Sequence, residues 1–168
     1  MATLSQSKVY SRFFSKVRAY DLTDLSVSDD EKMEMLRNWL YSAIAEPYII
    51  RLFSTVSMDE DDDSITYTLE NSEDDFKDEL FIIEVLSYAM ILSWLEPQIA
   101  TTELTAQLLG TSNEKFYSQA NHLNELRALR DDIESKTRCL IRDRGYINND
   151  YINGLASSAG MREVDSSS

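Results

Sequence analysis

Few residues of this chain have the type and spacing that catalysis requires. The chain has one histidine, His122, and one cysteine, Cys139, 17 positions apart in a segment predicted to form a single helix. That spacing separates them by about 25 Å along a helix axis, so a Cys–His nucleophile pair within one chain is excluded. The sequence also has no His or Cys cluster for zinc and no glycine-rich phosphate loop. We therefore predict no catalytic residue, no cofactor, no metal and no enzymatic activity.

One acidic stretch resembles a metal-binding pattern. Four acids fall at positions 1, 3, 5 and 12 of a calcium loop, namely Asp59, Asp61, Asp63 and Glu70. Position 6 is Ser64 where the loop requires glycine for its turn, and position 8 is Thr66 where an aliphatic residue is expected. We therefore interpret this stretch as a solvated acidic loop.

Two charged residues interrupt apolar patterns. Glu84 lies within the run Leu80–Leu95, whose large apolar side chains point in nearly every direction around a helix. Arg130 lies within the apolar stripe of a later helix. A carboxylate among apolar neighbours must be paired, protonated or turned to an edge. We predict a structural ion pair between Glu84 and Arg130 across the fold.

These positions imply an all-α fold, a helical bundle around the buried central helix Leu80–Leu95. A membrane span needs about 20 apolar residues. This run is shorter and contains a carboxylate, so we expect it in a soluble core and predict no membrane association. Pro97 is expected to end the helix, because proline lacks the amide proton and disfavours helical geometry in the residue before it.

Other helices are predicted from apolar periodicity and capping residues. The first covers Ser7–Tyr20. The next begins with a capping box, Ser28 to Glu31, and runs to about Ala45 with four apolar residues facing inward: Met33, Leu36, Leu40 and Ile44. After Pro97 a shorter helix covers Gln98–Leu109, and a long helix covers roughly Asn113–Arg144.

The segment 58–72 is the least helical part. Ile65, Tyr67 and Leu69 alternate with threonines, which is strand periodicity. A single short strand is not stable alone. It either pairs with a copy in another subunit or forms the extended edge of a long acidic loop.

Composition limits the partners. The chain has 168 residues, with 30 acids against 16 bases and a net charge of −14. Such a charge disfavours binding to duplex DNA or to an anionic membrane. Lys8–Arg18 carries four bases and no acid, whereas Asp59–Glu79 carries 11 acids and one lysine. This asymmetry suits docking on a basic partner or simply solubility. The single cysteine favours a reducing compartment.

The chain divides into a helical domain, residues 1–145, and a C-terminal tail, residues 146–168. The tail begins with a Tyr-Ile-Asn unit that recurs five positions later, and it ends in small polar residues. Such a segment is typically frayed or becomes ordered only on a partner.

Three stretches together resemble a known family: Lys8-Val-Tyr-Ser-Arg-Phe, Met90–Ile99 and Phe116–Asp131. They are similar to the head–tail connector (adaptor) proteins of tailed bacteriophages that infect Gram-positive bacteria. The resemblance covers about three-quarters of the chain and omits the acidic loop and the tail after Ile152.

The resemblance implies a structural virion protein of the neck, assembled in the host cytoplasm. It implies a ring, commonly of twelve copies, that binds the portal protein, extends the DNA channel without binding DNA specifically, and contacts a tail-side neck protein, a stopper or a tail terminator. The portal-binding anchors would be Tyr146, Ile147, Tyr151 and Ile152. Two alternatives remain: an acidic phage protein that mimics DNA and inhibits a host DNA-binding enzyme, and a helical scaffold with no phage role.

Overall fold

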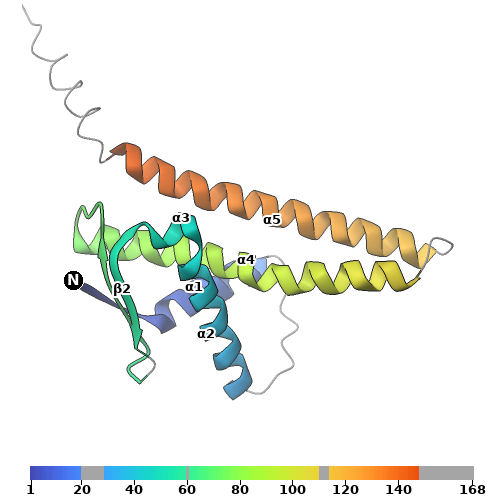
Figure 1. Cartoon of the computed structure of the whole chain (residues 1–168), viewed down its shortest axis with the longest axis horizontal. Helices are drawn as coiled ribbons and strands as arrows, with labels where there is room; N and C mark the ends of the chain where they lie inside the picture. Colours follow the sequence, from blue (N-terminus) through green and yellow to red (C-terminus); the bar gives the residue numbers. More distant parts are fainter. Residues whose placement is uncertain (20–28, 60, 110–113, 148–168) are drawn as a thin grey trace, which may run out of the picture.

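The fold is mostly helical and includes a small three-stranded sheet (Figure 1). The computed structural model describes residues 1–19, 29–59, 61–109 and 114–147. Within them the elements are, in chain order, β1 (Ala2–Ser5), α1 (Gln6–Ala19), α2 (Asp29–Ala45), α3 (Pro47–Ile50), β2 (Phe53–Asp59), β3 (Ser64–Leu69), α4 (Asp75–Leu109) and α5 (Glu114–Ile147). The helical character is as predicted, whereas the sheet is larger than the single strand expected.

The sheet corrects the interpretation of Ile65–Leu69. This segment belongs to β3, the central strand, which pairs antiparallel with β1 on one side and β2 on the other. Both edges of β3 are therefore occupied within its own chain, and it offers no edge to another subunit. The prediction missed β1 because four residues are too short to show periodicity. Ile65, Tyr67 and Leu69 face the core, as their alternation predicts.

A buried glutamine ties the hairpin of β2 and β3 to the first helix. Gln6 donates from Nε2 to the carbonyl oxygens of Asp59 at 3.2 Å and Ser64 at 3.4 Å. Its Oε1 accepts a hydrogen bond from the Tyr10 hydroxyl at 2.8 Å. Burial raises the pKa of Tyr10 to about 12, so this hydroxyl keeps its proton. The acidic end of the hairpin is thus held by α1.

Helix α4 is the core helix, as predicted, but it does not end at Pro97. It continues to Leu109 with Pro97 inside it. Proline removes one hydrogen bond and its ring crowds the carbonyl group four residues earlier, so a helix continues through it only where packing compensates. Trp94 and Leu95 are buried just before the proline, and α5 runs beside α4 both before and after it (Figure 1). Packing against α5 therefore outweighs the local preference to stop.

By length and composition alone, α4 could cross a membrane. The most apolar 18-residue window within Asp75–Leu104 has a mean hydropathy of 1.5, so the expectation that the central helix is too short for a membrane span does not hold. Half of its apolar window is buried inside the fold, where α1, α2 and α5 pack on it. Glu84 in this window pairs with basic residues of α1. These features are those of the core helix of a globular protein.

Helix α2 follows its predicted bounds closely. Leu36, Leu40 and Ile44 are buried, but Met33 is exposed, so its predicted inward position is wrong. Ser28 of the predicted capping box lies outside the described residues. Pro47 separates α2 from the short helix α3.

Helices α4 and α5 lie side by side, and their far ends extend beyond the sheet, α1 and α2 (Figure 1). We call this extension the arm; it comprises residues 96–109 of α4 and 114–131 of α5. Among the arm side chains that the structure describes, residues 96–104 and 120–131, most are exposed and Leu126 is buried. This described part of the arm therefore has little core of its own.

Candidate docking surfaces

The acidic tip of the β2–β3 hairpin uses its carboxylates to build the turn. Asp59 Oδ1 accepts from the backbone amides of Asp61 at 2.9 Å and Asp62 at 3.3 Å. Asp63 has a left-handed backbone, with φ of 46°, and its carboxylate accepts from Arg37 at 2.8 Å. Aspartate tolerates this conformation better than most residues. The tip is a fixed acidic projection.

The four acids of the calcium-loop pattern do not converge. Asp59 and Ser64 are paired at one end of the hairpin, whereas Leu69 pairs with Phe53 at the other end. Glu70 follows Leu69, so the whole of β3 separates it from the tip, about 20 Å at the rise of a strand. In the described part of the chain no group of three or more His, Cys, Asp or Glu side chains is placed to hold a metal ion.

Glu84 is paired, but with partners other than the predicted one. Its Oε2 accepts from Arg12 Nε at 2.7 Å, and its Oε1 accepts from Lys16 Nζ. Lys16 also lies over the ring of Tyr88, 3.5 Å from its centroid. Burial opposes the charged carboxylate, yet the bonds from Arg12 and Lys16 hold the pKa of Glu84 below its usual value. This cluster fixes α1 to α4.

Arg130 does not reach Glu84, which corrects the predicted pair. Its guanidinium is 3.7 Å from Asp131 and 3.9 Å from Glu134, and its side chain is 45% exposed. Arg130 lines a cleft with Glu96 of α4, and Glu84 is 12 residues earlier on that helix, about 18 Å away along its axis. The apolar patterns predict that both charged residues lie on inward-facing stripes. They do not predict how far along the helical pair each residue lies.

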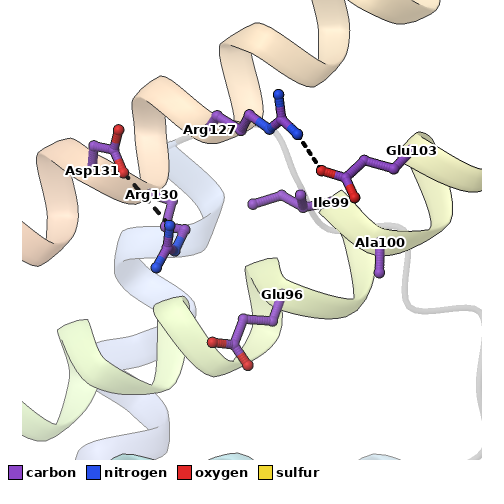
Figure 2. A pocket seen from close by; sticks show the side chains of 7 residues that line it. All are labelled: Glu96, Ile99, Ala100, Glu103, Arg127, Arg130 and Asp131. Atoms are coloured by element: carbon purple, nitrogen blue, oxygen red, sulfur yellow. Dashed lines mark hydrogen bonds and ion pairs between the residues drawn. The ribbon is translucent and has the colours of Figure 1, made fainter. Parts of the chain in front are cut away.

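The cleft between α4 and α5 in the arm is an open, charged groove of about 400 Å³. Figure 2 shows Arg127 reaching across it to Glu103, while Arg130 turns back to Asp131 on its own helix. Its lining carries charges of both signs, and its internal ion pairs already use several of them. We therefore interpret it as the seam between the two helices and not as a ligand pocket.

The sequence did not predict a buried ion pair that joins the last turn of α5 to the first turns of α4. Arg144 Nη2, in the last turn of α5, donates to Asp78 Oδ1 in the first turns of α4, and to the carbonyl oxygen of Asn71 at 3.2 Å. The side chains of Arg144 and Asp78 are 11% and 5% exposed. The guanidinium also lies over the ring of Phe81 at 4.3 Å. We call this contact the α5 anchor.

The Asp78 carboxylate accepts several hydrogen bonds. Besides Arg144 it accepts from the Ser72 hydroxyl at 2.6 Å and from the Glu73 amide at 3.1 Å. Burial disfavours its charged form, but these hydrogen bonds together lower its pKa below the ordinary value. Ser72 thus donates to Asp78, and at the start of α4 the Asp74 carboxylate accepts from the Phe76 amide at 3.0 Å.

A sequence signal for the α5 anchor existed. Asp78 is four residues before Ile82, and Arg144 is four after Leu140, so each charge continues an apolar stripe of its helix. Charges in such positions require a partner. What the sequence lacked was the antiparallel alignment that brings the end of α5 to the start of α4.

The predicted portal-binding residues fall at the edge of the described structure. Tyr146 and Ile147 belong to the last turn of α5, so the helix continues past the predicted boundary at residue 145. Tyr151 and Ile152 lie outside the described residues. Of the two residues considered for chemistry, His122 is exposed and Cys139 half-buried, both on α5.

Comparison with known proteins yields no relative. No protein-family model matches this chain, and no curated protein and no solved structure matches it either.

Proposed function

We propose that this chain is a structural protein of a bacteriophage neck, a head–tail connector whose ring binds the portal and extends the DNA channel. In this proposal the helices form a connector bundle around α4, and residues 146–168 are the docking tail that binds the portal. Catalysis, cofactors and metals have no part in the role. The second partner is the tail-side neck protein, a stopper or a tail terminator.

The observation that carries the proposal is the division of the fold into a body and an arm. The body contains the sheet, α1, α2, α3, residues 75–95 of α4 and residues 132–147 of α5. In the described part of the arm most side chains are exposed. Helices in proteins gain most of their stability from packing. An arm with so little core of its own is best explained by contacts with neighbouring molecules in an assembly.

The α5 anchor supports a docking role for the C-terminal segment. It fixes the last turn of α5, and with it Tyr146 and Ile147, to the body through the Asp78–Arg144 pair. The segment that carries Tyr151 and Ile152 therefore starts from a defined point. A fixed starting point reduces the conformational entropy that a segment loses when it binds its partner.

The charge distribution is compatible with a DNA channel. Acids dominate the hairpin tip and the start of α4, and the whole chain carries −14. A negative wall repels phosphates, so DNA can slide past without being bound. Helix α5 is nearly neutral, with six acids and seven bases in Glu114–Ile147.

That near-neutral helix also weighs against the alternative of a DNA mimic. A mimic of duplex DNA needs negative charge over an extended surface, yet α5, whose described charged side chains are mostly exposed, carries acids and bases in nearly equal number. The mimic remains the second candidate because of the acidic hairpin tip. A helical scaffold with no phage role predicts neither portal binding nor inhibition of a DNA-binding enzyme.

The direct test is to mix the purified chain with the portal ring of its phage and to image the particles by electron microscopy. A stoichiometric collar coaxial with the portal is the expected result. An intact portal that stays bare in the presence of the folded chain would refute the proposal. Salt-sensitive inhibition of a nuclease, in competition with duplex DNA, would then favour the mimic.

A further inference from the structure

The buried core of this fold ends where the arm begins. In the described part of the chain, every buried apolar side chain except Leu126 belongs to the body. Along α4 the last buried positions are Trp94 and Leu95. Along α5 the body begins beside Ile133, whose side chain is fully buried. The arm therefore adds little to the packing that holds the body together.

The contacts that hold the two arm helices together are few and lie close to solvent. Ile99 and Leu129 are half-buried apolar residues of the arm that pack against the core cluster containing Leu126. The ion pair between Arg127 and Glu103 joins the two helices through side chains that are 52% and 38% exposed. An exposed pair of this kind contributes little to stability. The open groove of about 400 Å³ beside it leaves the seam accessible to water (Figure 2).

The hydrogen-bond ladder of α4 is interrupted at the level where the body ends. Pro97 has no amide proton, so it cannot donate to the carbonyl group of Ser93 four residues earlier. Just beyond it, the hydroxyl of Thr101 donates to the carbonyl oxygen of Pro97 at 2.8 Å. Thr102 donates in the same way to Gln98, also at 2.8 Å. Such side-chain bonds to the preceding turn slightly destabilise helices, so the packing and the ladder are both weak from this level onward.

The two arm helices cannot separate independently. Only four residues, 110–113, connect the end of α4 at Leu109 to the start of α5 at Glu114. Four residues span at most about 14 Å. A helix that leaves its neighbour also loses most of its stability, because helices in proteins depend on packing. Loss of the contact between the two arm helices therefore affects both of them.

We propose that the arm opens as one cooperative unit while the body stays folded, with Pro97 as the boundary on α4. Local openings occur where buried apolar contacts are few, and their free energy lies below that of global unfolding. The opening is a property of the free chain and does not depend on the proposed connector function. A partner that binds only the closed arm shifts the equilibrium toward it, so the order of the arm responds to assembly.

Amide hydrogen exchange of the full chain, followed by mass spectrometry, measures the opening. Peptides from residues 98–104 and 120–131 report on the arm, and a peptide from residues 82–95 reports on the body. After correction for intrinsic rates, the arm amides should exchange at least about a hundredfold faster than those of the body peptide. Low urea should accelerate exchange more steeply in the body, because global unfolding exposes more surface than arm opening. Equal protection of the two parts of α4 would overturn the proposal.

Ile82→Val separates local opening from global unfolding. Ile82 is fully buried, and it lies 15 residues before Pro97, about 22 Å along α4. Removing one methyl group there should accelerate exchange in the body peptide about fivefold. The substitution destabilises the closed and the arm-open forms equally, so exchange in the arm should not change. If the arm accelerates by the same factor as the body, the arm unfolds only with the whole domain and the proposal is wrong.

Leu126→Ala tests whether the two arm helices form one unit. It removes the buried side chain that α5 contributes to the arm and should accelerate exchange about thirtyfold. The same factor is expected in the peptide from residues 98–104, although that peptide belongs to α4. Acceleration confined to the α5 peptide would contradict a single cooperative unit.

Pro97→Ala tests the boundary and does not depend on a destabilised variant. Alanine supplies the missing amide donor and should slow exchange of residues 98–104 about tenfold. The matched control is Gln98→Ala, which changes only the exposed side chain of the next residue and should alter the rate by less than about twofold. If Pro97→Ala exchanges no more slowly than this control, Pro97 is not the boundary and the proposal fails.

Discussion

Replacement of Arg144 by alanine is the perturbation for which the structure gives the clearest magnitude. Removing one partner of a buried ion pair destabilises a protein by about 3–5 kcal/mol, because the other charge stays buried. Asp78 would keep its hydrogen bonds from Ser72 and Glu73. We therefore expect the lower end of that range, about 3 kcal/mol of unfolding free energy.

Urea unfolding followed by circular dichroism at neutral pH measures this loss. The matched control is Arg142→Ala, two residues earlier, since its ion pair with Asp143 lies on the surface. Exposed pairs contribute about 0–1 kcal/mol. If Arg144→Ala costs no more than Arg142→Ala, the α5 anchor has no structural role and the reasoning is wrong.

The pH dependence of the same variant checks the electrostatic part. The pKa of Asp78 is lowered in the folded state. A carboxylate with a lowered folded pKa contributes stability above its unfolded pKa, about 3.9, and loses it as the pH falls through the folded value. The stability gap between wild type and Arg144→Ala should therefore narrow on acidification below about pH 4. A gap that widens would contradict the assignment of the charge to Asp78.

Four further substitutions follow from the fold. Glu84→Ala should lower the unfolding free energy by about 2 kcal/mol, because it leaves two bases of α1 without their carboxylate. Arg130→Ala should lower it by less than about 1 kcal/mol. Urea unfolding compares the two variants, and a larger loss for Arg130→Ala would contradict this assignment of partners. Pro97→Ala should raise the unfolding free energy by about 1–2 kcal/mol, because it supplies the missing amide donor; a lower urea midpoint would contradict this. Gly145→Ala should add about 0.5–1 kcal/mol, since the new methyl group meets no atom within 4 Å in this helix; a lower thermal midpoint would count against helical geometry there.

The helices were largely predictable because each carries an apolar stripe whose period a sequence displays directly. Val9, Phe13 and Val17 of α1 are all buried as their spacing requires. What local pattern could not predict depends on packing. Pro97 is a typical stop signal, but α5 holds α4 together across it. Strand β1 has four residues, and only its pairing with β3 makes it recognisable.

The same holds for the candidate sites, where local pattern identifies the residues that need partners but not the partners themselves. That Glu84 requires partners follows from its apolar neighbours alone. Which basic residues pair with Glu84 depends on where α1 crosses α4. The residue spacing within either helix does not show where this crossing lies. Arg130 and Arg144 both continue apolar stripes of α5, yet one is at an open rim and the other is buried. Arg144 is buried because it lies on the body, and Arg130 is exposed because it lies on the arm.

The position at which the chain is truncated tests the docking tail and the α5 anchor separately. A chain ending at Ile147 keeps every described residue, so its unfolding free energy should change by less than about 0.5 kcal/mol. A chain ending at Asp143 loses Arg144 and should lose the same 3 kcal/mol or so as the point variant, with the last turn of α5 as an added loss. In the proposed function neither chain joins the portal ring, but the first fails for lack of Tyr151 and Ile152 while fully folded. Portal joining by the chain ending at Ile147 would refute the docking tail and leave the anchor intact. Equal stability of the two truncated chains would refute the anchor and leave the docking tail to be judged by portal binding alone.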